Sequence, residues 1–95
     1  MSLEALTSKY IFSAEKVLKE LQQTKVPVSV TEEAVGNILR WAANYLEDAK
    51  YYKALGKFET CLTSVAYCEG LLDALRLLGV VKFEWPTNQE RKKLF

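Results

Sequence analysis

The chain has 95 residues, the length of one domain, and a domain of that size buries only about 60–65% of its unfolded surface. Its 13 basic and 12 acidic residues leave a net charge of +1, which argues against a broad electrostatic surface for nucleic acid or membrane. Histidine, the commonest general base and metal ligand, is absent. The N-terminus lacks a signal-peptide pattern, and no apolar run is long enough to span a bilayer.

The two cysteines, Cys61 and Cys68, fall within one expected helix. At about 1.5 Å rise per residue their Cα atoms are roughly 10 Å apart, whereas a disulfide needs less than about 7 Å. No histidine or second cysteine pair completes a zinc site. We therefore predict buried, reduced thiols, a cytoplasmic location, and neither a metal nor a cofactor.

The first helical pattern runs from about Leu3 to Gln23. Its apolar residues recur with helical spacing on one stripe, and the opposite side carries lysine and glutamate. Phe12 falls outside the stripe and is expected to be exposed. The stripe consists of Leu3, Leu6, Tyr10, Ala14, Val17, Leu18 and Leu21.

The segment TKVPVSVTEE interrupts the helical pattern because its proline cannot sit inside a helix. Ser29, followed three residues later by Glu32, is typical of a capping box, and Thr31 is an alternative N-cap. The second helix is expected to run from this point to about Leu55. Gly56 then supplies the backbone freedom that a helix end requires.

The third helix is expected from about Lys57 to Leu78, with Gly79 ending it. The turn at 55–58 is so short that the second and third helices must form an antiparallel hairpin. If the hairpin folds about Gly56, the numbers of facing residues sum to about 112. This register places Asp73 opposite Leu39 and Arg40.

The tail after Gly79 alternates Val81, Phe83 and Trp85 with charged residues, which indicates an extended, half-buried segment. Thr87, with a glutamate three residues later, predicts a second capping box and a short helix over residues 88–95. The predicted fold is all-α. Residues 1–80 form an up-and-down three-helix bundle, and residues 81–95 form a tail packed on the bundle or on a partner.

Charged residues interrupt the third helix beside its core. Asp73 can pair with Arg40 across the hairpin, and Glu69 and Asp73 can both reach Arg76 along the helix. Gly70 is tolerated if the seam against the second helix is thin. Packing with local ion pairs is the favoured interpretation, and an acidic ligand or metal site is the alternative. The candidate polar cluster is Arg40, Asp48, Glu69, Asp73 and Arg76.

The back of the third helix is apolar as well, although a helix of a three-helix bundle should be polar there. A central position in a skewed bundle would explain this pattern. Otherwise the tail, a second copy of the chain or another partner must cover the surface. The candidate interaction surface is Tyr67, Leu71, Ala74, Leu78, Phe83, Trp85, Leu94 and Phe95.

The stretch YLEDAKYYKALGKFETCLTSVAYCEGLLDALRLLG, from Tyr45 to Gly79, resembles a family of small archaeal proteins classed as a domain of unknown function. The shared pattern is paired aromatic residues, a glycine turn, then Tyr-x-x-Gly-Leu-Leu-Asp-Ala and a closing Leu-Gly. The resemblance implies a three-helix bundle of the albumin-binding-domain type and no assigned activity. The turn at Gly56 is also similar to that of a tetratricopeptide hairpin, which leaves peptide binding open.

These observations predict a non-enzymatic, cytoplasmic protein–protein interaction module that acts through apolar helix faces and forms a homodimer. No catalytic residue is expected. One alternative is an acidic ligand- or metal-binding bundle around Glu69 and Asp73. Another is a nucleic-acid-associated protein that uses its basic tail, although little basic surface lies beyond that tail.

Overall fold

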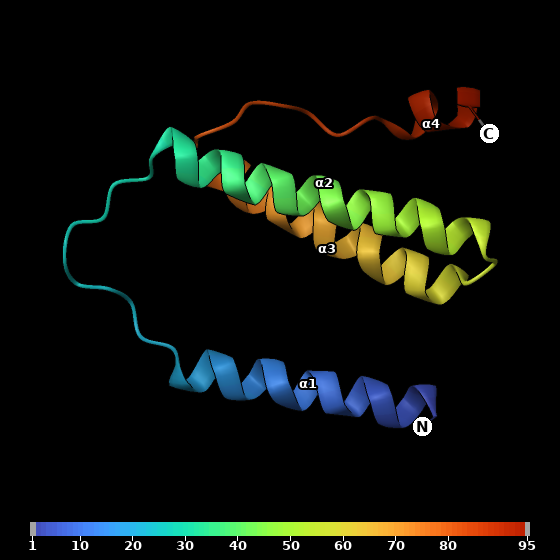
Figure 1. Ribbon diagram of the computed structural model, residues 1–95, viewed down its shortest axis with the longest axis horizontal. Helices are drawn as coiled ribbons and strands as arrows, with labels where there is room; N and C mark the ends of the chain where they lie inside the picture. The colour runs from blue at the N-terminus through green and yellow to red at the C-terminus, as the bar shows by residue number, and fades with distance from the viewer. Residues whose placement is uncertain (1, 95) are drawn as a thin grey trace.

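The computed structural model describes residues 2–94, apart from the side chains of Lys93 and Leu94. Within that range the chain forms helices and no strand (Figure 1). The helices are α1 (Leu3–Glu20), α2 (Glu32–Ala54), α3 (Phe58–Leu77) and α4 (Asn88–Leu94). The predicted all-α class, with an extended C-terminal segment and a short final helix, is confirmed.

The packed part of the molecule is the antiparallel hairpin of α2 and α3, the only two helices in contact among the described residues. Its core consists of Ala42 and Ala49 from α2 and Cys68 and Leu75 from α3. The alanines let the two backbones approach closely, and Leu75 is completely buried between them. Burial of one such leucine contributes about 1.5–3 kcal/mol.

The predicted register of the hairpin is confirmed. The rings of Tyr45 and Tyr67, whose numbers sum to 112, lie 4.4 Å apart between centroids. Gly56 has a φ of 75°, and the Lys57 amide donates to the Tyr52 carbonyl at 2.9 Å. The turn therefore has the left-handed glycine and the i to i−5 backbone hydrogen bond of a Schellman motif, which ends a helix.

The helix ends follow their capping residues, with one correction. Thr31, not Ser29, is the N-cap of α2, because the Thr31 hydroxyl accepts a hydrogen bond from the Ala34 amide at 3.0 Å. The predicted cap at Thr87 is confirmed, since the Thr87 hydroxyl accepts from the Glu90 amide at 3.2 Å, and the Glu90 carboxylate accepts from the same hydroxyl and not from the backbone amide of a full capping box.

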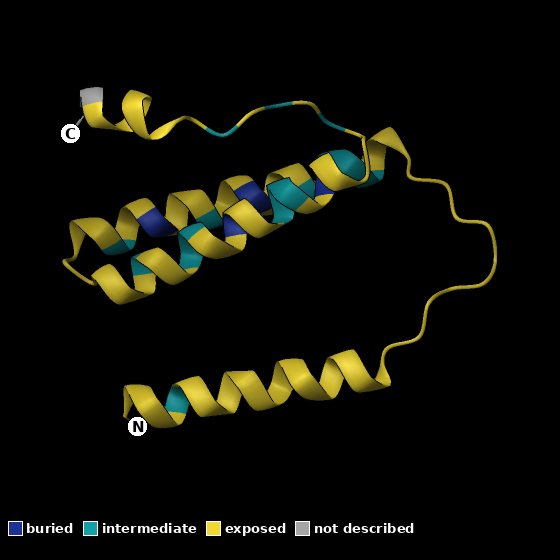
Figure 2. Ribbon diagram, turned by 180° about the vertical axis from the view of Figure 1, so that it is seen from behind, coloured by how far each residue is buried: buried dark blue, intermediate teal, exposed yellow. Residues whose placement is uncertain are grey.

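Helix α1 lies apart from the hairpin and has no buried residue (Figure 2). Its apolar stripe is exposed except for Leu6, which is half-buried, because nothing among the described residues packs against it. Phe12 is exposed, as predicted. The helix ends at Glu20, earlier than expected, because Leu21 adopts extended backbone at ψ 147° and leads into an extended linker.

The C-terminal segment runs beside the hairpin on the side away from α1 (Figures 1 and 2). Val81, Phe83 and Trp85 are half-buried, whereas Lys82 and Glu84 between them are exposed. The alternation in the sequence therefore corresponds to an extended segment with one side turned to the protein.

Gly70 and Gly56 offer opposite tests of this fold. Gly70 is exposed, and a Cβ placed there would meet no atom within 4 Å, so the expected thin seam is not the reason for this glycine. We expect Gly70→Ala to stabilise the protein by about 1 kcal/mol through helix propensity.

Gly56→Ala should destabilise the protein by about 1–2 kcal/mol, because alanine is strained at positive φ. Thermal unfolding followed by circular dichroism tests both, and a lower Tm for Gly70→Ala would contradict the geometry of α3.

The two cysteines should differ in reactivity. Both are free thiols, with Cys68 buried in the core and Cys61 only half-buried. Burial, and then the neighbouring Glu69 carboxylate, raise the pKa of Cys68, so its reactive thiolate is scarce at neutral pH. With a thiol reagent at pH 8 we expect Cys61 to react first and Cys68 only as the hairpin opens. The variants Cys61→Ser and Cys68→Ser show which thiol gives the fast reaction and which gives the slow one. Equal reaction rates of the two thiols in the folded protein would contradict the buried position of Cys68.

Candidate interaction surfaces

Aromatic side chains join α2 and α3 along one side of the hairpin. The ring centroids of Trp41 and Tyr45 lie 6.2 Å apart, and those of Tyr45 and Tyr67 lie 4.4 Å apart. Trp41 and Tyr67 remain 60% and 55% exposed, so the rings touch one another without being covered. We call this side the open face; it comprises Trp41, Tyr45, Tyr67, Leu71, Ala74 and Leu78.

The open face contains the apolar back of α3 that the sequence singled out. Leu71 is half-buried, whereas Tyr67, Ala74 and Leu78 are exposed. Trp41 and Tyr45 were missed as members, because the predicted interaction surface drew only on the third helix and the tail. The register of the hairpin could have found them, since it pairs Tyr45 with Tyr67.

Tyr45 is half-buried, unlike the exposed Trp41 and Tyr67 of the same aromatic row. Desolvation raises the pKa of the Tyr45 hydroxyl, and the neighbouring Tyr67 and the Asp48 carboxylate raise it further. Tyr45 therefore stays neutral at physiological pH. The row offers ring faces and phenol hydroxyl groups to a partner, a combination common at the centres of protein interfaces.

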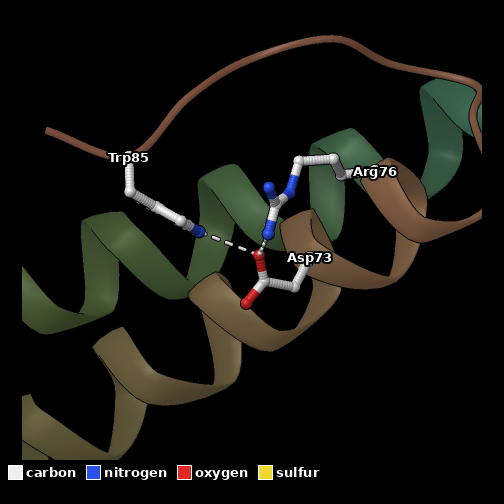
Figure 3. Close-up of polar contacts among 3 residues, drawn as sticks. All are labelled: Asp73, Arg76 and Trp85. Carbon is white, nitrogen blue, oxygen red and sulfur yellow. Dashed lines mark hydrogen bonds and ion pairs between the residues drawn. The ribbon is translucent and has the colours of Figure 1, made fainter.

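A second arrangement holds the extended C-terminal segment, residues 81–85, which we call the strap (Figure 3). The Trp85 indole Nε1 donates to the Asp73 carboxylate at 2.8 Å, and the Arg76 guanidinium pairs with the same oxygen at 3.2 Å. The Arg76 guanidinium also lies 5.3 Å from the centre of the Phe83 ring. Phe83 and Trp85 meet edge to face at 5.0 Å. One carboxylate and one guanidinium of α3 thus hold two aromatic residues of the strap.

The strap and the open face lie on different sides of α3. At about 100° per residue, Tyr67, Ala74 and Leu78 are about 100–140° around the helix from Asp73. The predicted interaction surface therefore divides into two, because Phe83 and Trp85 lie with Asp73 and not with Tyr67. The Leu94 side chain and Phe95 lie outside the described residues.

The predicted polar cluster does not gather at one place. Asp73 and Arg76 form the expected pair, but the pair expected between Asp73 and Arg40 is wrong, because Arg40 donates to Asn37 on its own helix instead. Asp48 and Glu69 are exposed. Among the described residues, no three cysteine, aspartate or glutamate side chains are grouped so that they could hold a metal ion.

The sequence profile of one family, described as Protein of unknown function (DUF357), matches residues 9–81. The chain belongs to this family. The matched region includes most of α1, the whole hairpin and Val81, and it ends before Phe83 and Trp85. No curated protein and no solved structure matches the chain. None of the helices in the described part is long and apolar enough to cross a membrane.

The bond between Trp85 and Asp73 can be measured by a double-mutant cycle. Trp85→Phe keeps the ring and removes the donor, while Asp73→Ala removes the acceptor. We expect a coupling of about 1 kcal/mol, toward the low end for a hydrogen bond to a charged group because Asp73 is half-exposed. Urea unfolding of the two single variants and the double variant gives the coupling. Strictly additive effects would mean that the strap is not held by this bond.

Proposed function

We propose that this protein is a small, non-enzymatic, cytoplasmic interaction module that associates with itself through the open face. Helix packing supplies the mechanism, since apolar and aromatic side chains of two copies exclude water against each other. The two free thiols support a reducing compartment.

The observation that supports self-association, without locating the face that is used, is the amount of surface that the isolated chain leaves in water. Its accessible area is 8645 Å² for 10.8 kDa. A compact monomer of this mass exposes about 5,500 Å². The radius of gyration is 16.4 Å, against about 12.4 Å for a compact chain of this length. A dimer that covered this excess of about 3,000 Å² on each copy would bury about 6,000 Å² in total, the scale of a large obligate interface.

The composition of the open face also supports self-association. Trp41 and Tyr67 are residue types enriched at interface centres. A two-fold axis through this face would place the aromatic rows of both copies together, since a symmetric dimer uses the same patch twice. Leu78 lies at the end of the row, 61% exposed.

Light scattering on protein eluting from a sizing column tests the proposal at two concentrations. We expect twice the 10.8 kDa chain mass, and a loss of dimer in Leu78→Lys. Lysine is acceptable at this helix end, because a cation near the C-terminus is favourable. The matched control is Leu62→Lys, which places the same charge at an equally exposed leucine (68%) on another side of α3 and should leave the dimer intact.

A monomer at both concentrations with a compact hydrodynamic radius would contradict the proposal. In that case α1 would cover the hairpin of its own chain. Equal loss of association in both lysine variants would show that any apolar surface on α3 suffices, and that the open face is not a specific interface.

A further inference from the structure

Two side chains of α3, those of Asp73 and Arg76, hold the strap by contacting a simple sequence pattern in it. An aromatic ring two residues before a tryptophan meets one guanidinium, and the tryptophan indole donates to one carboxylate. Glu84, which lies between the two aromatic residues, is exposed and takes no part in these two contacts. An extended backbone is needed, because only its two-residue period turns Phe83 and Trp85 to the same side.

On the hairpin, the strap is received by the ion pair of Asp73 and Arg76 on α3. Arg76 and Gly79 also line a shallow cleft, and its other four lining residues belong to the strap itself: Val81, Lys82, Phe83 and Glu84. Asp73 and Arg76 are each about two-fifths exposed even with the strap in place, at 42% and 43% for the side chains. Few contacts have to break for the strap to leave, so its occupancy is reversible by ordinary thermal opening.

The family match separates the receiving side from the strap. It covers the whole of α3, including Asp73 and Arg76, and ends at residue 81. The two strap aromatics that these residues hold lie beyond the match. The two residues of α3 that receive the strap thus lie in the family region, and the two aromatic residues that they receive do not.

We propose that this side of α3 is a recognition site for an extended protein segment that carries an aromatic residue, any residue and then tryptophan. The strap is its occupant in the same chain, and a segment of this pattern from a partner protein is its ligand in trans. Asp73 and Arg76 determine specificity, the first by accepting the indole N–H and the second by covering the preceding ring. The site is separate from the open face and does not depend on self-association.

A labelled peptide with the sequence VVKFEWPTN, residues 80–88, tests the proposal against the full-length chain. The receptor is the variant Phe83→Ala/Trp85→Ala, whose own strap is weakened. We expect fluorescence anisotropy to show binding at least ten-fold tighter than to the wild-type chain, where the strap competes. Adding Asp73→Ala to the receptor should weaken binding about ten-fold, the effect of losing a hydrogen bond to a charged group.

The matched control is a peptide with Phe83 and Glu84 exchanged, which keeps the composition and breaks the alternation. It should not bind. Binding that is indifferent to Asp73, or to this exchange, would overturn the proposal as non-specific apolar association. Helix content of the receptor is checked by circular dichroism, and Trp85→Phe in the full chain replaces the double variant if helicity is lost.

The remaining tryptophan permits a measurement without added peptide. Trp41→Phe leaves Trp85 as the single tryptophan of the chain, so its emission reports whether the strap is seated. Adding Asp73→Ala to this variant should release the strap and shift the Trp85 emission to the red as its ring enters water. A seated Trp85 with no peptide binding to the weakened receptor would overturn the proposal, because the strap would then be a fixture of its own chain.

Discussion

The close approach of α2 and α3 at small residues is the constraint on which the rest of the structure depends. Ala42 and Ala49 allow the two helices to meet around Leu75 and Cys68, and these four residues are the whole buried core of the described chain. A seam this narrow buries little beyond itself. It therefore fixes the register of the hairpin while leaving large apolar side chains on both of its flanks, which is why this small domain has more than one surface suited to a partner.

The two flanks differ in chemistry. The open face presents stacked rings with no charged group among its members, which suits a broad, water-excluding contact. The strap side has an acid and a base placed to distinguish one tryptophan from other residues, which suits a narrow contact with an extended segment. Because these sides lie at different angles around α3, one copy can use both at once. The proposed self-association and the proposed segment recognition are compatible for that reason.

Much of the local structure could be predicted from the sequence. The glycine at the hairpin turn, the threonine cap of α4 and the alternation of the tail each depend on the chemistry of a few adjacent residues, and the structure has each of them. The side-chain contacts of the candidate site were harder to predict from the sequence. Asp73 was paired with Arg40 from register alone, but register brings backbones together and does not choose rotamers, so the nearer Arg76 and the more distant Trp85 hold it instead.

By itself, then, the sequence determined the helices, the glycine turn between α2 and α3 and the register of the hairpin, because backbone sterics and 3.6-residue periodicity act over a few residues. Only the tertiary structure decided that Phe83 and Trp85 lie on another side of α3 from Tyr67, and that Trp41 belongs with Tyr45. Those outcomes depend on the path the chain takes after Gly79 and on which side chains meet across the seam. A linear pattern of apolar residues indicates that a surface will be buried but does not identify the segment that covers it.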